Sequence, residues 1–220
     1  HAAPDSDEVL SGTLQRHRTT WDAFAPLQAA HADELRELVP RSSKYAELLP
    51  YVPEGENYLY FTSCRTGDKY KFFGWRTRYW SLLLKLAKNQ PSWTITASPG
   101  PAIGPFHWSG RRLTAEELMA LQTFPQGYRV EGTPRDVLRQ LGNAVPSLMG
   151  EILAREIRVQ LLGHRVRPGL KLLPSYAPSP ATQPKERRMP RELIAKYRNE
   201  DVQDHPGEGR GPGAVRRAIG

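Results

Sequence analysis

The chain has 220 residues with 20 prolines, 18 glycines and a mean hydropathy of -0.58, so we expect a hydrophobic core of moderate size and additional unpacked segments. Its single cysteine excludes an internal disulfide and a cysteine cluster for zinc, and no apolar run reaches the roughly 18 residues of a membrane span. The net charge of +8 indicates a polyanionic partner, and the cysteine content favours a reducing, cytoplasmic compartment.

The first sixty residues are expected to form short elements. Residues 1–15 have neither a signal-peptide nor a transit pattern, so we expect an irregular leader within a longer or processed protein. Residues 14–28 (LQRHRTTWDAFAPLQ) and 32–39 (ADELRELV) have the apolar spacing of short helices. Residues 56–63 (ENYLYFTS) alternate in polarity, which predicts a strand.

Residues 60–95, called here the basic aromatic segment, mix cations with aromatic rings. Residues 62–90 alone carry 7 Lys and Arg against 1 Asp. Cations neutralise phosphates and planar rings stack on bases, so this mixture suits a nucleic-acid surface. A small domain with aromatic core residues and ordinary surface cations has the same composition, and the pattern alone leaves both interpretations open.

Three elements are expected between residues 78 and 110. Residues 78–89 (RYWSLLLKLAKN) have helical apolar spacing and stop before Pro91, which predicts a helix. Residues 92–98 (SWTITAS) predict a short β segment, and residues 98–110 (SPGPAIGPFHWSG) predict a loop because of their prolines and glycines. Helices and short β segments together predict an α+β fold.

A capping box predicts the next helix. Thr114 is followed three residues later by Glu117, the spacing at which each side chain binds the other residue's backbone N–H. The helix is expected over residues 115–123 and is ended by Pro125.

A longer helix of about seventeen residues is expected from Pro146 to Gly163, because apolar residues recur there at every fourth position. Gly142, just before it, permits either close backbone approach or positive φ. Asn143 offers an amide near the unpaired N–H groups of the helix N-terminus, either as a cap or as a ligand contact. The recurring apolar residues are Met149, Leu153, Ile157 and Leu161.

The C-terminal part, residues 163–220, is rich in Pro and Gly and carries 12 Lys and Arg against 6 Asp and Glu. Such a composition buries too little apolar surface to offset the entropy of ordering, so we expect disorder, except for a short helix over residues 191–198. The charge suits a solubilising tail better than a specific nucleic-acid arm.

Two ordered blocks carry a family resemblance. RRLTAEELMALQTFPQGY (111–128) and, after a short interval, RQLGNAVPSLMGEILAREI (139–157) resemble the last two conserved blocks of the DNA (cytosine-5)-methyltransferases. Glu116 departs from the pattern, because the family usually has Arg there. The matching positions are Arg111, Leu113, Thr114, Glu117, Leu121, Gln122, Phe124 and Pro125 in the first block, and Gln140, Gly142, Asn143, Ala144, Val145 and Pro146 in the second.

The resemblance implies an organisation and a set of contacts. Residues 16–110 correspond to a target recognition region that ends in the pair Thr94 and Ile95, residues 111–163 hold the two blocks, and residues 164–220 form the tail. The cofactor contacts implied are Asn143, Ala144 and Val145, which are expected to line the S-adenosylmethionine pocket. The candidate contacts to double-stranded DNA are Arg76, Arg78, Thr94, Arg111 and Arg112.

The family's catalytic blocks are missing, so no catalytic residue is assigned in this chain. There is no Pro-Cys nucleophile, and Cys64, in TSCRTG, has no evident activating partner and is expected to be structural or incidental. The resemblance therefore implies the C-terminal half of an enzyme that methylates C5 of a flipped cytosine, without a metal. The last helix is expected to pack onto a doubly wound α/β methyltransferase domain outside this sequence.

Three arrangements agree with the sequence. The chain is either a fragment of one longer enzyme, or the recognition subunit of a split methyltransferase whose partner supplies catalysis, or a DNA-binding module without an enzymatic role. The first two predict that the chain alone transfers no methyl group. The third predicts DNA binding and no methylation with any partner.

Overall fold

The computed structural model describes residues 6–12, 14–27, 38, 40, 45–73, 80–178 and 187–198. The chain forms two compact units, each assembled from three separate stretches. We call the first the helical unit (residues 1–38, 87–99 and 113–181) and the second the aromatic unit (residues 39–86, 100–112 and 182–220).

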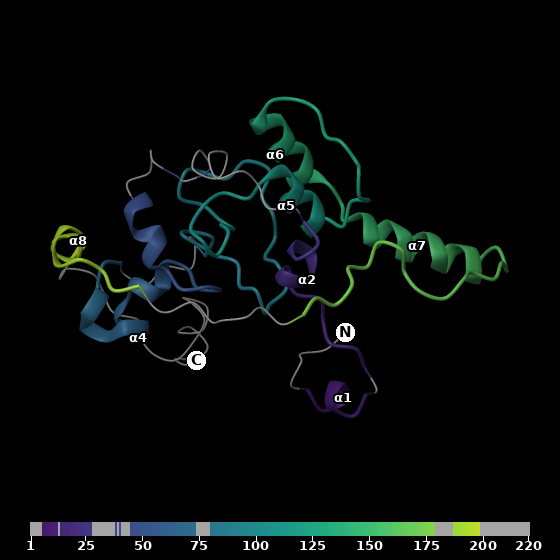
Figure 1. Cartoon of the computed structure of the whole chain (residues 1–220), viewed down its shortest axis with the longest axis horizontal. Coiled ribbons are helices and arrows are strands. Elements are labelled where there is room, and N and C mark those ends of the chain that lie inside the picture. Colours follow the sequence, from purple (N-terminus) through teal and green to yellow (C-terminus); the bar gives the residue numbers. More distant parts are fainter. Residues whose placement is uncertain are drawn as a thin grey trace, which may run out of the picture. The chain divides into compact units, whose positions relative to one another are not determined.

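The helical unit is built from short α-helices and one longer helix, α7 (Figure 1). Helix α5 packs against both α2 and α6. Three of these helices start with a capping box, which gives two N-terminal N–H groups a partner. The helices are α1 (Asp7–Leu10), α2 (Thr20–Phe24), α5 (Ala115–Leu121), α6 (Pro134–Asn143) and α7 (Ser147–Gln160).

The aromatic unit consists of short helical turns around a core of packed rings. Its largest fully buried side chains include Tyr58, Phe61 and Phe106. Residues 82–85 and 103–106 run beside each other through two isolated bridges, Leu82 with Ile103 and Lys85 with Phe106. The turns and helices are η1 (Ala46–Tyr51), η2 (Tyr58–Phe61), α4 (Ser63–Thr66), η3 (Gly67–Tyr70) and α8 (Arg191–Tyr197).

The predicted strand over residues 56–63 is wrong. Residues Tyr58–Phe61 form a 3-10 turn, which begins where the Asn57 side chain accepts a hydrogen bond from the Leu59 backbone N–H at 3.0 Å. Three of its four residues, Tyr58, Tyr60 and Phe61, are buried. In a half-exposed strand buried and exposed residues alternate, so the burial of the neighbours Tyr60 and Phe61 does not fit one.

The predicted helix over residues 78–89 is also wrong. Its described part, from Trp80 on, has no helical turn, and Leu83 has a φ of 54°, outside the right-handed helical region. Leu83, Leu84 and Leu86 are all buried, so these apolar residues are core residues of a segment without regular secondary structure. Residues 92–98 form no strand either. Among the described residues the β part of the expected α+β fold is limited to the two isolated bridges.

The predictions that rest on local helix signals fare better. The helix after Thr114 begins with the expected capping box, the long helix after Pro146 runs as α7, and the short C-terminal helix is α8. The expected helix over residues 14–28 is reduced to α2, and most of residues 32–39 lie outside the described residues. Helix α6 was not predicted.

Candidate functional site

Gln122 joins the two blocks that resemble the methyltransferase family. Its side-chain amide Nε2 donates to the carbonyl oxygens of Leu141, at 2.7 Å, and Ala144, at 3.3 Å, at the end of α6. Its own backbone oxygen accepts from Ser147 N at 3.0 Å, at the start of α7. One buried residue after α5 thus supplies partners for the end of one helix and the beginning of the next.

Thr123 completes this junction. It has a left-handed backbone, with φ 55°, and its hydroxyl accepts from Leu148 N at 2.8 Å. The backbone N–H groups of Ser147 and Leu148 already donate to Gln122 and Thr123. The expectation that the helix N–H groups beside Asn143 are unpaired is therefore wrong for the N–H groups of Ser147 and Leu148. Asn143 is instead the last residue of α6.

Gly142 is required by close approach and not by positive φ. A Cβ on Gly142 would lie 2.7 Å from the carbonyl carbon of Thr96 and closer still to the backbone of Ala97. The segment that follows Thr94 and Ile95 therefore lies directly on α6.

The predicted cofactor residues lie in the link between α6 and α7, on an open surface. Val145 is 71% exposed, Ala144 is half-buried and Asn143 is exposed. The Asn143 side chain makes no hydrogen bond to any described residue, so its amide is available to a ligand. These three residues offer an amide and two small apolar side chains to a ligand, and their contact with S-adenosylmethionine stays a prediction.

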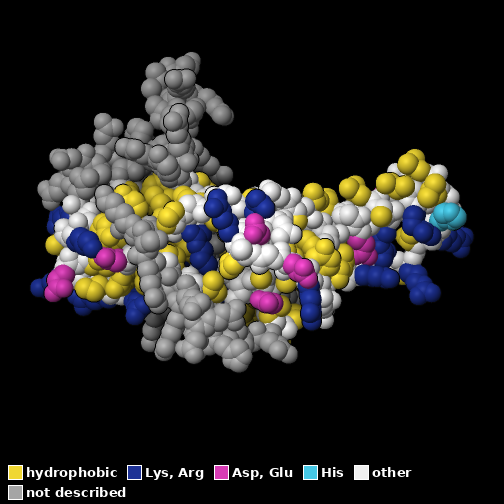
Figure 2. Space-filling view, turned by 90° about the horizontal axis from the view of Figure 1, so that it is seen from above, with side chains coloured by type: hydrophobic (Ala, Val, Ile, Leu, Met, Phe, Trp, Pro, Cys, Tyr) yellow, Lys and Arg dark blue, Asp and Glu magenta, His cyan; other side chains and the backbone are white. Residues whose placement is uncertain are grey.

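Helix α7 continues this open surface with an apolar face. None of its residues is buried, and Met149, Leu153 and Ile157 are 49–56% exposed. These residues recur every four positions from Val145 and so form one stripe along the helix. Hydrophobic side chains gather on this part of the helical unit in Figure 2.

Another side of α7 is covered by the chain that follows it. The carboxylate of Glu151 accepts from the backbone N–H groups of Lys171 and Leu172 at 2.8 and 2.9 Å and pairs with Arg155 at 3.0 Å. Arg155 also donates to the carbonyl oxygen of Arg167 at 2.7 Å. The apolar stripe is thus left open while a polar side of the helix is used internally.

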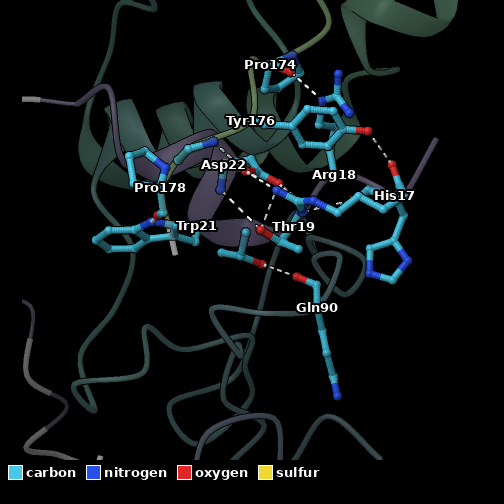
Figure 3. Close-up of polar contacts among 12 residues, drawn as sticks. His17, Arg18, Thr19, Trp21, Asp22, Gln90, Pro174, Tyr176 and Pro178 are labelled. Carbon is cyan, nitrogen blue, oxygen red and sulfur yellow. Dashed lines mark hydrogen bonds and ion pairs between the residues drawn. The ribbon is translucent and has the colours of Figure 1, made fainter. Parts of the chain in front are cut away.

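Farther along, the same segment reaches α2 at Asp22 (Figure 3). The Asp22 carboxylate is 1% exposed and accepts from Thr19 N and Ala177 N, both at 2.8 Å, and from both terminal nitrogens of Arg16 at 3.0 and 3.2 Å. Burial raises the pKa of Asp22, but the hydrogen bonds from Thr19, Ala177 and Arg16 outweigh it and lower the pKa overall.

The Tyr176 ring packs between two guanidinium groups in this cluster. The guanidinium carbon of Arg18 lies 3.3 Å from the ring centroid and that of Arg16 lies 4.2 Å from it. The Tyr176 hydroxyl donates to the Arg16 carbonyl oxygen at 2.8 Å, and the Trp21 indole donates to that of Pro178 at 2.7 Å. The expectation of disorder therefore does not hold for residues 174–178.

The predicted DNA contacts fall in different environments. Arg76 and Arg78 lie outside the described residues. Thr94 is exposed beside the buried Ile95, whereas Arg111 is buried and donates to the Arg112 carbonyl oxygen at 2.9 Å. None of these observations tests a DNA contact, so all five stay predictions.

Arg112 holds the Pro- and Gly-rich loop. Its guanidinium donates to the carbonyl oxygens of Ile103, Gly100 and Pro101 at 2.8, 2.7 and 3.0 Å and lies 4.7 Å from the centroid of the Phe106 ring. Burial lowers the pKa of Arg112. No sequence signal indicated this use of the side chain.

Lys85 is a further residue that sequence reasoning missed. It is 3% exposed, and burial lowers its pKa to about 8, helped by the charge of Arg187 and opposed by that of Glu54.

Glu116, the departure from the family pattern, lines a groove of about 740 Å³ in the helical unit. In the part of the chain that the structure describes, no helix is long and apolar enough to cross a membrane, and no group of three or more His, Cys, Asp or Glu forms a metal site.

Comparison with known proteins identifies relatives. Residues 54–159 match the family model of C-5 cytosine-specific DNA methylase. The type II methyltransferase M.SacI of Streptomyces achromogenes is 42% identical over 167 residues, which are 71% of this chain and 41% of that protein. M.NgoFVII of Neisseria gonorrhoeae is 30% identical over 148 residues, which are 66% of this chain and 37% of that protein.

A third relative is shorter. M.AquIB of Picosynechococcus sp. is 40% identical over 90 residues, which are 36% of this chain and 63% of that protein. No solved structure matches the chain. The chain spans less than half the length of M.SacI and M.NgoFVII. Its residues 54–159 thus match the C-5 cytosine-specific DNA methylase family, and the chain is homologous to type II methyltransferases over part of their length.

Proposed function

We propose that this chain is the C-terminal part of a type II DNA (cytosine-5)-methyltransferase, that it recognises duplex DNA, and that it forms one wall of the S-adenosylmethionine site. The observation that carries the proposal is the open apolar stripe of α7, which runs on from Val145. An amphipathic helix gains stability by burying its apolar face against a neighbour. The neighbour proposed here is the catalytic domain, for which the unmatched majority of M.SacI leaves ample length.

The proposed cofactor wall lies at the N-terminal end of this stripe. The Asn143 amide can both donate and accept hydrogen bonds, while Ala144 and Val145 offer small apolar contacts. S-adenosylmethionine supplies the methyl group when it is bound. The residues of this chain bind and orient it, and the seating of α7 on the catalytic domain excludes water from that side.

The proposed DNA surface is the recognition region, residues 16–110, with Arg76, Arg78 and Thr94 as direct contacts. Arg111 and Arg112 follow this region directly. Since Arg112 binds three carbonyl oxygens of the loop 100–103, a contact from it to phosphate competes with those bonds. We therefore assign Arg112 mainly to holding this loop, and Arg76 and Arg78 to phosphates or guanine edges.

A split enzyme is the second candidate, and the size of M.AquIB favours it. Only 90 aligned residues make up 63% of that relative, whereas 167 make up 41% of M.SacI. M.AquIB is therefore a much shorter chain that still holds a region similar to this one. A short chain of this family suits a division of recognition and catalysis between two polypeptides.

The test measures methyl transfer and DNA binding separately. Purified chain is incubated with duplex DNA and radiolabelled S-adenosylmethionine, alone and with the catalytic part encoded upstream or in a neighbouring gene. We expect duplex binding by the chain alone and methyl transfer only with the catalytic part. Transfer by this chain alone would contradict the proposed division of labour, and DNA binding without transfer under all conditions would favour a non-catalytic module.

Two sets of variants locate the surfaces. Leu153→Glu, on the apolar stripe of α7, should abolish association with the catalytic part, whereas Ala154→Glu, exposed beside it, should leave association intact. Replacement of Arg76 and Arg78 by Ala should lower DNA affinity and reduce its salt dependence, by a slope of about 1 for each lost phosphate contact. An unchanged salt slope would remove these arginines from the phosphate surface.

A further inference from the structure

Helix α8 lies outside the segment that matches the family, yet it completes the core of the aromatic unit. The family match ends at residue 159, and α8 begins more than thirty residues later. Met189, just before the helix, is 3% exposed within the core cluster, and Leu193, Ile194 and Tyr197 pack against the same cluster. Figure 1 shows α8 and α4 at the same end of the view, and both belong to the aromatic unit. The apolar residues of α8 therefore have a defined partner, which a solubilising tail does not need.

The contacts of α8 reach the basic aromatic segment directly. The ring centroid of Tyr197 lies 6.1 Å from that of Phe72 and 6.3 Å from that of Tyr45. Phe72 stacks on Phe61 at 5.3 Å with an angle of 26° between the rings, and Phe73 meets Tyr45 edge-on at 5.0 Å. Such ring pairs stabilise the packed core beyond the effect of the apolar area that they bury.

The backbone of the same residues is fixed as well. The N–H groups of Phe72 and Phe73 both donate to the carbonyl oxygen of Phe61, at 2.9 and 3.2 Å. Tyr197 thus packs on a ring whose own backbone is bound to the centre of the core.

An ion pair sets how α8 lies along η1. Lys196 Nζ donates to both carboxylate oxygens of Glu47, at 2.9 and 2.8 Å, and this hydrogen bond raises the pKa of Lys196. Both side chains are more than half exposed, so the pair adds little stability and mainly favours one alignment of the helix.

We infer that α8 is a brace for DNA recognition, in which Tyr197 and Leu193 are positioning residues that hold the aromatic rings of the basic aromatic segment in place. The inference rests on the proposed function, because it assigns the braced unit to duplex DNA. It goes further than the proposed function because it gives a recognition role to α8, which lies beyond the residues that match the family model. Tyr197 and Leu193 act through Phe72 and its neighbours and touch no DNA themselves.

The experiment uses the full chain and compares variants on one helix. The double variant Leu193→Ala with Tyr197→Ala removes the brace, Tyr197→Phe keeps the ring, and Arg191→Gln changes an exposed residue of the same helix. Hydrogen exchange at the amides of Phe72 and Phe73 reports on the core, and fluorescence anisotropy with a duplex reports on DNA affinity. Ile194→Val, which deletes only one methylene, serves as the milder variant if the double variant does not fold.

The expected result couples the two measurements. In the double variant both exchange rates should rise and DNA affinity should fall about tenfold, which corresponds to about 1.4 kcal/mol. Tyr197→Phe, which keeps the packed ring, and Arg191→Gln, which changes an exposed side chain, should leave the exchange rates and the DNA affinity within about twofold of the parent chain. Ile194→Val should change both measurements in the same direction by a smaller factor.

Three outcomes overturn the inference and can be told apart. Unchanged exchange, or faster exchange with unchanged DNA affinity, shows that α8 does not brace a DNA-reading surface while the proposed function stands. If the parent chain binds no duplex, the proposed function fails and the DNA role of α8 fails with it. In that case faster exchange in the double variant still identifies α8 as a core element.

Discussion

The side-chain amide of Gln122 donates to the carbonyl oxygen of Leu141 at 2.7 Å, and this bond ties the end of α5 to the end of α6. Gln122 is buried, so its loss removes the shorter of the two hydrogen bonds to the Leu141 carbonyl oxygen, which then keeps only the 3.3 Å bond from Ala144 N. We expect Gln122→Ala to lower the free energy of unfolding of the helical unit by about 1–3 kcal/mol, measured by urea unfolding. Gln126→Ala, at an exposed loop position, is the matched control and should change stability by less than about 0.5 kcal/mol.

A second prediction separates two glycines on neighbouring helices. A methyl group on Gly142 meets the backbone of Thr96 and Ala97, which cannot move aside as a flexible side chain would. A methyl group on Gly150, in α7, meets nothing within 4 Å. Gly142→Ala should therefore destabilise the chain by about 1–3 kcal/mol, whereas Gly150→Ala should stabilise it by up to about 1 kcal/mol through helix propensity.

Thermal unfolding of the two variants, measured side by side, checks this prediction. Equal shifts of the two melting temperatures would show that residues 96 and 97 do not lie against α6 in solution.

A third prediction concerns Asn143 in an enzyme reconstituted with its catalytic part. Because the Asn143 side chain is exposed and makes no hydrogen bond to described residues, Asn143→Ala should leave the fold intact. It should weaken binding of S-adenosylmethionine by about 1–2 kcal/mol, the usual cost of one lost hydrogen bond to a ligand, and leave DNA affinity nearly unchanged. Isothermal titration with the cofactor and anisotropy with DNA measure the two separately, and a larger effect on DNA would remove Asn143 from the cofactor wall.

Local signals explain which elements the sequence predicts. The capping box at Thr114 and the regular apolar spacing of α7 act within one helix, and both helices are present. Helix α6 has the same kind of signal, since Thr133 caps it, Asp136 completes the box and Pro134 stands in its first turn, but few of its residues are apolar, so apolar spacing does not reveal it. The apolar runs at residues 56–63 and 80–87 do not distinguish strand, helix and irregular chain, because tertiary burial decides among them.

The residues of the candidate site, too, could be predicted only where a local sequence pattern indicates them. The spacing of Gly142 and Asn143 before a helix indicated a junction, and the structure places them there. That Arg112 binds carbonyl groups and that Lys85 is buried depends on residues distant in the sequence, so no local pattern reveals either. The contacts of residues 174–178 with α2 span more than 150 residues and were missed for the same reason.

The fourth prediction concerns Asp22 and acid stability. Its pKa is lowered in the folded chain, so the stabilisation is complete above the ordinary pKa of about 3.9 and is lost as pH falls through the lowered value. Asp22→Asn should speed hydrogen exchange at the Ala177 amide, cost about 2 kcal/mol and flatten the acid side of the stability profile. Asp136→Asn, in the exposed capping box of α6, should leave exchange at Ala177 unchanged. The same slow exchange in both variants would show that Asp22 does not hold residues 174–178.

The last prediction concerns Lys85, whose pKa is lowered to about 8 mainly by burial. The unfolded chain keeps the proton up to the ordinary pKa near 10.5, so between pH 8 and 10.5 the unfolded state holds more protons than the folded state. The free energy of unfolding should therefore rise with pH across this window, by about 3 kcal/mol at most from this residue. Lys85→Met removes the cost of burying a charged ammonium group, so the variant should be more stable than the parent at pH 7. The difference in the free energy of unfolding between variant and parent should shrink as pH rises to 10. Urea unfolding at several pH values measures this, with the exposed Lys69→Met as the control that keeps the parent's slope. If parent and Lys85→Met differ by the same amount at every pH, the ammonium group of Lys85 reaches water in the folded chain.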